Sequence, residues 1–393
     1  MPGKPPQKPA TTLLRRPEIP RASQRPLGLP IVQASTFEID PALDRAMADG
    51  DYRSQFLYTR YNNPTVDALQ RRLAELHRGE DAVCTSSGMA AISSALFALT
   101  QAGDAIVADA RLYGQTHTLL TEFLAGAGRA VTFAPFDDAE ALERALAAAA
   151  EGGREVLAYA ETFANPLATP LDLPRAAGQA RSAGATFIVD NTFASPLVCQ
   201  PLAHGAHVVV ESLTKSIAGH SDVVGGAVIT DAARGQRVWR AMLHLGGCMD
   251  PHAAFLVWRG MKTLAMRTET ASKSARALAE ALRGAPGVAD VWYPDTEGKP
   301  WLEGSGSMLA FSLRGGDAAA HRALDAFTVV TAATSLGGVE SLACLPYNTS
   351  HRTPEARQSV GLAPGTVRLS VGCEAEEDLI ADVLQAVATA TAD

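Results

Sequence analysis

The chain has 393 residues, of which 47% are hydrophobic and 19% charged, and its formal net charge is -8. This length predicts two domains, or one large α/β domain with an appendage. The charge balance disfavours binding to nucleic acid or to an anionic membrane, and no apolar run is long enough to span a bilayer. The five cysteines are scattered without CxxC spacing, so we expect no metal site, no disulfide framework and a cytoplasmic location.

The N-terminal segment differs in composition from the rest of the chain. Residues 1–28 are rich in proline, lysine and arginine, which predicts a mobile or extended arm, with plain disorder as the alternative. From residue 64 onward, helical and strand patterns alternate. Helices are expected at 65–77 and 90–100, and strands at 82–85, 105–109, 156–160, 185–190 and 206–211. These strands are almost continuously apolar, which favours a mostly parallel sheet covered on both faces.

The pattern changes after Pro251. A long helical run reaches about Leu282, strands are expected at 308–313 and 367–371, and a final helix begins near Glu376. We therefore predict an arm that contacts a partner subunit at residues 1–63, a large α/β domain at 64–252, and a smaller α+β domain at 253–393.

One of the six lysines differs from the others in its sequence context. Lys215 follows the apolar strand 206–211 and precedes a loop that contains three glycines. A lysine beside a buried strand end has a lowered pKa and can attack an aldehyde. Taken alone, this position favours a reactive site only weakly over a structural lysine.

An acidic residue ends the strand before that lysine. Asp190 closes the strand 185–190, and ligands of open α/β sheets bind at this carboxyl edge. A carboxylate there can hold a pyridine nitrogen protonated, which makes the ring an electron sink. A helix N-cap or turn residue is the commoner explanation of an isolated aspartate.

A phosphate-binding turn is expected at residues 85–89 (TSSGM). The turn joins a strand to a helix, so free N–H groups and the positive end of the helix dipole would face an anion at Ser87, Gly88 and Met89. Ser212 and Thr214 can add hydroxyl groups to the same phosphate. An ordinary serine N-cap followed by a glycine turn remains the alternative.

Two further side chains complete the set. Tyr113 follows the strand 105–109 and can stack on an aromatic ring, and the guanidinium of Arg368 is suited to an α-carboxylate. Either residue alone is an ordinary core or surface residue. The ordered combination of phosphate turn, tyrosine, aspartate, lysine and arginine indicates pyridoxal phosphate acting on an amino acid.

These residues carry a family resemblance. From about Leu29 to the C-terminus, the chain resembles the Cys/Met-metabolism pyridoxal-phosphate enzymes of fold type I. That family includes cystathionine γ-synthase, cystathionine γ- and β-lyases, methionine γ-lyase and O-acylhomoserine sulfhydrylase. The matching segments are 58–65 (YTRYNNPT), 86–91 (SSGMAA), 112–114 (LYG), Glu161, 165–166 (NP), 189–192 (VDNT), 214–215 (TK), 219–220 (GH), 259–264 (RGMKTL), 335–342 (SLGGVESL) and 367–372 (VRLSVG).

The resemblance implies a role for each residue. Lys215 would bind the cofactor aldehyde and move protons, Asp190 would pair with the ring nitrogen, and Tyr113 would stack on the ring. The implied phosphate ligands are Ser87, Gly88, Met89, Ser212 and Thr214, completed by Tyr58 and Arg60 of a neighbouring subunit. The implied ligands of the substrate carboxylate and cofactor edge are Asn165, Ser335 and Arg368. Shared sites imply at least a dimer, and family members are usually homotetramers.

The chain departs from the family where the distal end of the substrate binds. Thr118 stands where enzymes of cystathionine carry an arginine, and Thr334 where cystathionine γ-lyases carry a glutamate. Gln115 replaces the cysteine of methionine γ-lyases, and the segment 346–351 (PYNTSH) is also atypical. The cofactor residues match the family pattern, so the departures concern the distal substrate pocket.

We therefore predict β- or γ-elimination, or γ-replacement, on a sulfur-containing or O-acylated amino acid with a compact or apolar side chain. Methionine, homocysteine and an O-acylated homoserine fit better than cystathionine. The main alternative is cystathionine γ-lyase or γ-synthase activity with different distal contacts. A pyridoxal-phosphate-fold sensor would need a DNA-binding module, and this acidic sequence offers no basic helix-turn-helix segment. Motifs 58–60 and 335–338 disfavour an aminotransferase.

Overall fold

The computed structural model describes residues 26–349 and 354–392. Residues 1–25 of the predicted arm lie outside this range, as do Ser350 and His351 of the atypical segment 346–351. Residues from Ile31 onward belong to one compact unit. The boundaries predicted at residues 63/64 and 252/253 therefore stay a prediction.

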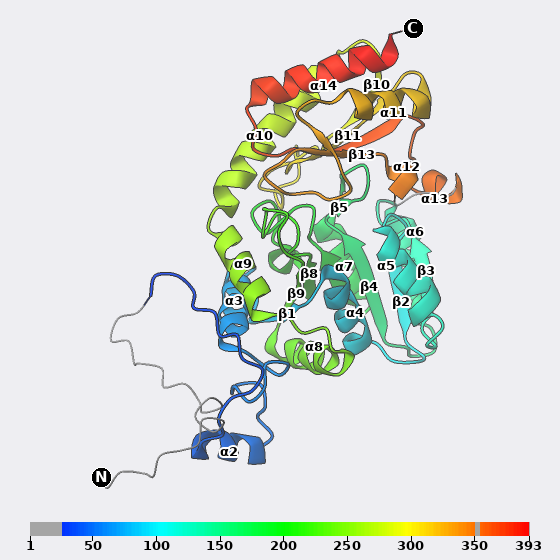
Figure 1. Ribbon diagram of the computed structural model, residues 1–393. Helices are drawn as coiled ribbons and strands as arrows, with labels where there is room; N and C mark the ends of the chain where they lie inside the picture. The colour runs from blue at the N-terminus through cyan, green and yellow to red at the C-terminus, as the bar shows by residue number, and fades with distance from the viewer. Residues whose placement is uncertain (1–25, 350–353, 393) are drawn as a thin grey trace. The chain divides into compact units, whose positions relative to one another are not determined.

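A seven-stranded sheet forms the centre of this unit (Figure 1), with the strand order β1-β9-β8-β7-β4-β2-β3. Its strands are parallel except β9, which is antiparallel to both of its neighbours. The predicted mostly parallel sheet is thus confirmed. The strands are β1 (Asp81–Thr85), β2 (Ala105–Asp109), β3 (Ala130–Ala134), β4 (Val156–Glu161), β7 (Thr186–Asp190), β8 (Val208–Glu211) and β9 (Gly226–Thr230).

Two strands of this sheet were not predicted. Edge strand β3 alternates between exposed and partly buried residues, and it lacks the continuous apolar run that marks a central strand. Strand β9 is fully buried, but it begins at Gly226, the last glycine of the loop expected after Lys215. The glycines were interpreted as a loop signal, and the short strand behind them was missed.

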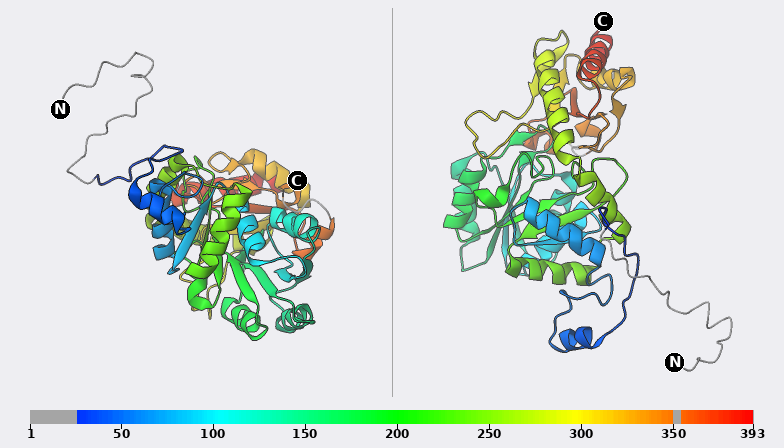
Figure 2. Two further views of the ribbon diagram at one scale, coloured as in Figure 1. Left: turned by 90° about the horizontal axis from the view of Figure 1, so that it is seen from below. Right: turned by 90° about the vertical axis from the view of Figure 1, so that its left-hand side faces the viewer.

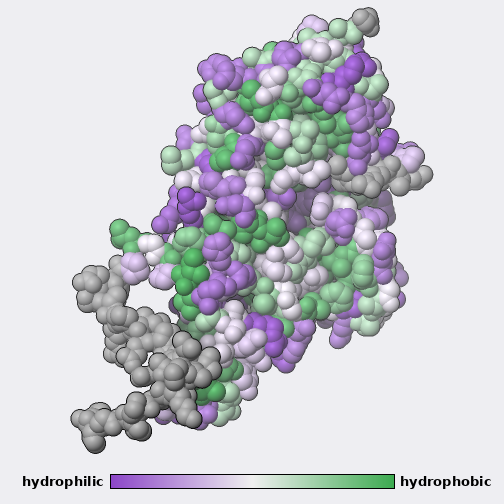
Figure 3. Space-filling model, viewed as in Figure 1, coloured by the Kyte–Doolittle hydropathy of each residue, from purple (hydrophilic) through white to green (hydrophobic). Residues whose placement is uncertain are grey.

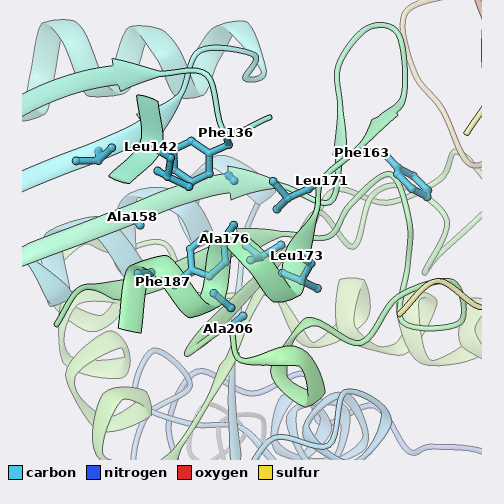
Figure 4. Close-up of a cluster of buried hydrophobic side chains, with 14 of the residues drawn as sticks. Phe136, Leu142, Ala158, Phe163, Leu171, Leu173, Ala176, Phe187 and Ala206 are labelled. Carbon is cyan, nitrogen blue, oxygen red and sulfur yellow. The ribbon is translucent and has the colours of Figure 1, made fainter. Parts of the chain in front are cut away.

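Helices cover both faces of the sheet. One face packs against α4 (Gly88–Leu99) and α8 (Ala232–Leu245), with α5 (Gly114–Thr118) nearby. The other face packs against α3 (Pro64–Leu76), α6 (Ala139–Ala149), α7 (Leu173–Ser182) and α9 (Pro251–Met261). Figure 4 shows part of this second layer, where Leu173 and Ala176 of α7 lie close to Phe187 of β7. This covering explains why the strands are apolar on both sides.

A second, five-stranded sheet has the order β10-β11-β14-β13-β12. Its strands are β10 (Val288–Trp292), β11 (Met308–Leu313), β12 (Thr331–Ala332), β13 (Leu342–Cys344) and β14 (Thr366–Ser370). It shares a core with α10 (Leu264–Arg283), α11 (Gly316–Ala326) and α14 (Glu376–Thr391). Figures 1 and 2 show α14 beside α10, and these elements form the predicted smaller α+β part.

Shorter elements complete the described chain. They are α2 (Pro41–Ala48), α12 (Pro346–Thr349), α13 (Pro354–Ser359), the short 3-10 helix Pro201–His204, the π-helical segment Leu119–Leu124 after α5, and the hairpin of β5 (Phe163–Ala164) and β6 (Thr169–Pro170). On the face shown in Figure 3, hydrophilic and hydrophobic residues are interspersed. No helix among the described residues has the length and apolarity needed to cross a membrane.

The long helix expected after Pro251 is interrupted. Helix α9 ends at Met261 and α10 begins at Leu264, so the prediction of one continuous run is wrong. The carbonyl of Gly260 accepts hydrogen bonds from the Thr263 hydroxyl at 3.1 Å and from Nη2 of Arg267 at 3.0 Å. Side chains thus satisfy the carbonyl at the break, and Arg267 also donates to the carbonyl of Ser216 at 2.8 Å. The break lets α10 hold the segment that follows Lys215.

Candidate active site

The carboxyl ends of the parallel strands meet at one edge of the large sheet, where open α/β sheets bind ligands. A cavity of about 260 Å³ lies there. Every predicted site residue lines it except Tyr58, Arg60 and Ser335. The lining residues are Ser87, Gly88, Met89, Ile92, Tyr113, Glu161, Phe163, Asn165, Asp190, Thr192, Phe193, Ser212, Thr214, Lys215, Val224, Thr334, Leu336 and Arg368.

The predicted phosphate turn lies at the N-terminus of α4. Ser87 is the N-cap, and its hydroxyl accepts a hydrogen bond from the N–H of Ala90 at 3.1 Å. The first N–H groups of a helix have no acceptor within the helix, so those of Gly88 and Met89 suit an anion. A Cβ atom at Gly88 would lie 2.9 Å from Cβ of Ser212. Glycine therefore lets the turn approach the loop after β8.

The loop after β8 presents both hydroxyl groups and Lys215. The N–H of Ser212 donates to the hydroxyl of Thr192 at 2.9 Å, and the Thr214 hydroxyl donates to the Gly225 carbonyl at 3.2 Å. The amine of Lys215 donates to the hydroxyl of Ser335 at 3.1 Å. Ser335 thus contacts Lys215, although it does not line the cavity. Burial lowers the pKa of the Lys215 amine, which favours the nucleophilic neutral form.

Asp190 lies at the end of β7 and is buried. Its Oδ1 accepts a hydrogen bond from the N–H of Thr192 at 3.0 Å, and its Oδ2 accepts one from the hydroxyl of Tyr159 at 3.3 Å. Burial raises the pKa of this carboxyl, and the hydrogen bonds from Thr192 and Tyr159 oppose that rise. A buried carboxylate of this kind is stabilised by a cationic partner such as a protonated ring nitrogen.

Asn165 and Arg368 lie together, although 203 residues separate them in the chain. The Nη1 group of Arg368 donates to Oδ1 of Asn165 at 3.1 Å, and its Nη2 group donates to the carbonyl of Thr334 at 3.3 Å. Arg368 is buried in β14 and lies 5.9 Å from the ring centre of Phe193. The guanidinium and the amide together suit a carboxylate ligand.

Tyr58 and Arg60 lie outside the cavity of their own chain. Tyr58 is 42% exposed. Arg60 donates to the carbonyl of Leu243 at 3.3 Å and lies over the rings of Tyr58 and Tyr61. Within one chain, these two residues do not complete the predicted phosphate site.

Several lining residues were not assigned a role from the sequence. Glu161 belonged to a matching motif, and its place at the end of β4 could have marked it in the same way as Asp190. Tyr159 precedes Glu161 on β4; it does not line the cavity, but its hydroxyl contacts Asp190. Apart from Met89, nothing in the sequence singled out the apolar lining residues, which are Ile92, Phe163, Phe193, Val224 and Leu336. Of the three single-residue departures from the family pattern, Thr334 lines the cavity, whereas Gln115 and Thr118 do not.

The chemistry of these residues fits pyridoxal phosphate. A helix N-terminus with hydroxyl groups can bind a phosphate, a buried lysine can bind an aldehyde, and a buried carboxylate can pair with a ring nitrogen. Residues 10–388 match the model of the Cys/Met metabolism PLP-dependent enzyme family. The chain belongs to this family. Its cofactor is pyridoxal phosphate, and the fold class predicted from the sequence is confirmed.

Individual relatives of this family member support the same assignment. An L-methionine gamma-lyase from Fusobacterium nucleatum subsp. polymorphum is 38% identical over 91% of this chain and 93% of its own. The structure of cystathionine gamma synthase from Xanthomonas oryzae pv. oryzae in complex with cystathionine has a TM-score of 0.86 and 38% identity, covering 93% of each chain.

A further solved structure bears on the cofactor. A candidate O-acetylhomoserine (thiol)-lyase from Campylobacter jejuni subsp. jejuni carries a pyridoxyl-lysine phosphate. It has a TM-score of 0.87 and 28% identity, covering 94% of this chain and 97% of its own. The family member described here is therefore an enzyme of sulfur amino acid metabolism that uses pyridoxal phosphate.

Proposed function

We propose that this enzyme eliminates or replaces the Cγ substituent of an amino acid with a small, uncharged side chain, such as methionine or an O-acylated homoserine. The observation that carries the proposal is the composition of the cavity wall. Six apolar side chains line it, Met89 among them, and the cations among its described lining residues are Lys215 and Arg368. Both cations have a role near the α-carbon, so neither serves a distal carboxylate.

Substrate binding begins at the α-carboxylate. The guanidinium of Arg368 is oriented by the Oδ1 atom of Asn165 and by the carbonyl of Thr334. This leaves further N–H donors of the guanidinium for the substrate carboxylate. A bound carboxylate at Arg368 places the amino acid in the same cavity as the amine of Lys215.

Proton movement at the α-carbon is assigned to Lys215. Burial and the charge of Arg368 lower the pKa of its amine, which increases the share of the neutral base. The hydroxyl of Ser335 orients the amine from the opposite sheet. The phenol of Tyr113, also in the cavity wall, is suited to donate a proton to the leaving group.

The cofactor site is assigned to the remaining polar residues. The N-terminus of α4 and the hydroxyl groups of Ser212 and Thr214 would hold the phosphate, Asp190 the ring nitrogen, and Tyr113 the ring face. When bound, pyridoxal phosphate supplies a ring that delocalises the electron pair left at the α-carbon. Asp190 strengthens this effect because its carboxylate favours a protonated ring nitrogen.

We further propose a cytoplasmic homotetramer with active sites shared between subunits. The positions of Tyr58 and Arg60 support sharing, because both lie outside the cavity of their own chain. All five cysteines are free, which fits a reducing compartment.

A substrate panel tests the proposed specificity. The holoenzyme is assayed with methionine, O-acetylhomoserine and cystathionine, and the thiol and keto acid products are measured. We expect kcat/KM for cystathionine to be lower by roughly 10- to 100-fold, because its distal charges would be desolvated without partners. Lys215→Ala should release no product from any of them.

The alternative has support from a relative. The Xanthomonas oryzae enzyme that binds cystathionine is 38% identical to this chain. A higher kcat/KM for cystathionine than for both other substrates would replace the proposed specificity with cystathionine γ-lyase or γ-synthase activity. Keto acid release would indicate elimination, whereas product formation only with an added thiol would indicate replacement.

A further inference from the structure

A carboxylate in the cavity wall has no part in the chemistry described so far. Glu161 is the last residue of β4, and it is buried. Its Oε1 accepts a hydrogen bond from the backbone N–H of Tyr113 at 2.5 Å, and its Oε2 accepts one from the backbone N–H of Asn165 at 3.3 Å. Tyr113 follows β2, whereas Asn165 follows the first strand of the small hairpin. One carboxylate therefore bridges two loops through its two oxygens.

The position of Tyr113 depends strongly on its backbone. Its side chain is 42% exposed, and it begins α5 without a side-chain capping bond. The Tyr113 carbonyl accepts a bond from the N–H of His117 at 3.0 Å, and its own N–H is directed to Glu161. The bond to Glu161 thus ties the start of α5 to the end of β4.

Asn165 carries the other half of the bridge. Its side-chain oxygen accepts from Nη1 of Arg368, so its backbone position affects the guanidinium. A continuous chain of hydrogen bonds therefore links Tyr113, Glu161, Asn165 and Arg368, in that order. It runs from the residue assigned to the cofactor ring to the residue assigned to the substrate carboxylate.

The two oxygens of Glu161 are suited to this bridging role. Burial and the neighbouring Asp190, its partner across β4 and β7, raise the pKa of the Glu161 carboxyl well above its usual range, and the hydrogen bonds from the N–H groups of Tyr113 and Asn165 only partly oppose that rise. Both oxygens of a carboxyl group keep lone pairs that accept hydrogen bonds, so each can receive one of the two N–H groups. With one backbone donor at each oxygen, a single side chain therefore holds both loops.

We propose that Glu161 is a positioning residue that sets the placement of Tyr113 relative to Asn165 and, through Asn165, of Arg368. The proposal rests on the proposed function, because it takes Tyr113 as the ring-stacking residue and Asn165 with Arg368 as the carboxylate site. Glu161 acts through these residues and takes no part in bond breaking.

Glu161→Gln is the sharpest substitution for a test. Glutamine has nearly the same shape, but it offers one acceptor oxygen and one donor amide. Two N–H groups then face a single acceptor, so one loses its hydrogen bond. The bond of Asn165 is the longer of the two, and we expect it to be the one lost. Glu143→Gln, on the exposed side of α6, makes the same chemical change away from the cavity and is the matched control.

Hydrogen–deuterium exchange of the holoenzyme gives a readout that is independent of turnover. We expect the amides of Tyr113 and Asn165 to be protected in the wild type. Glu161→Gln should speed exchange at Asn165 about tenfold, as expected for loss of one hydrogen bond. Glu143→Gln should change neither amide. With the substrate that is turned over fastest, Glu161→Gln should raise KM more than it lowers kcat.

Three results would overturn the proposal. The first is rapid exchange of both amides in the wild type, which needs no variant and decides the matter even if Glu161→Gln fails to fold. The second is unchanged exchange at both amides in Glu161→Gln. The third is altered exchange with an unchanged KM, which would make the bridge purely structural. A further outcome is a wild-type enzyme that turns over none of the three panel substrates. Altered exchange in Glu161→Gln would then support the bridge, while the inactive wild type would refute the proposed function.

Discussion

The amine of Lys215 donates a hydrogen bond to the hydroxyl of Ser335 at 3.1 Å, across a separation of 120 residues in the chain. Lys215 lies in the loop after β8 of the large sheet, and Ser335 lies between β12 and β13 of the small sheet. The two sheets therefore meet at the reactive amine. Any movement between them would alter the orientation of Lys215.

Replacement of Arg368 should change the pH dependence of cofactor attachment. Burial is the larger cause of the lowered Lys215 pKa, and the charge of Arg368 is the second. Attachment requires the neutral amine. Arg368→Met removes a nearby cation, so the pKa should rise and the pH midpoint of attachment should move upward. Absorbance of cofactor-free enzyme mixed with pyridoxal phosphate across pH measures this midpoint. Arg368→Lys keeps the charge and should shift the midpoint less; equal midpoints in wild type and Arg368→Met would contradict the prediction.

Asp190→Asn should retain the cofactor but lose most turnover. In this variant the N–H of Thr192 can still donate to the side-chain oxygen of residue 190, so we expect the local structure to be retained. The neutral amide cannot favour a protonated ring nitrogen, and we expect kcat to fall by about 10²-fold or more. The measurements are kcat and bound cofactor per chain. Asp109→Asn is a suitable control, because Asp109 also ends a buried strand but does not line the cavity. Full turnover in Asp190→Asn would mean that Asp190 has a structural role and does not act on the ring nitrogen.

Mixed subunits test whether Arg60 serves a neighbouring site. Arg60→Ala and Lys215→Ala should each be inactive. A one-to-one mixture that exchanges subunits should recover roughly a quarter of wild-type activity, because half the dimers would have one of two sites intact. Activity after dilution and reassociation measures the recovery. A double variant lacking both Arg60 and Lys215, mixed with Arg60→Ala, should recover nothing. Proven exchange without recovery would indicate that each site is built within one chain.

Asp382 should stabilise the folded chain in a pH-dependent way. Burial raises its pKa, but hydrogen bonds from Thr328, Val329 and Val330 outweigh that effect and hold the pKa at about 2. A lowered pKa contributes stability that is present above the unfolded value of 3.8 and is lost as pH falls through the folded value. Asp382→Asn should therefore reduce the free energy of unfolding by about 2 kcal/mol near neutral pH.

Urea unfolding of wild type and Asp382→Asn between pH 7 and pH 3 measures this effect. The difference should be constant near neutrality and should shrink below pH 4. Asp378 lies on the same helix with an exposed side chain, so Asp378→Asn should change the free energy of unfolding little and serves as the control. A difference that grows as the pH falls would contradict the assigned cause.

The sequence by itself determined most of the large sheet and the identity of the reactive residues. A buried parallel strand needs apolar residues on both faces, and this pattern is local. Asp190 and Lys215 could be placed near one another because each follows such a strand, and parallel strands share a carboxyl edge. Gly88 could be interpreted in the same way, because a turn that approaches an anion needs a residue without a Cβ.

Only the tertiary structure decided how distant segments meet. Patterns over a few residues carry no information on which loops pack together, so the contact between Lys215 and Ser335 and the bridge made by Glu161 were not predicted. At the break between α9 and α10, Arg267 binds the carbonyl groups of Ser216 and Ile217 in another loop, and helical periodicity carries no sign of this contact. Strand β9 was missed because its first residue, Gly226, was interpreted as part of a loop, and its pairing with β1 and β8 could not be seen in the sequence.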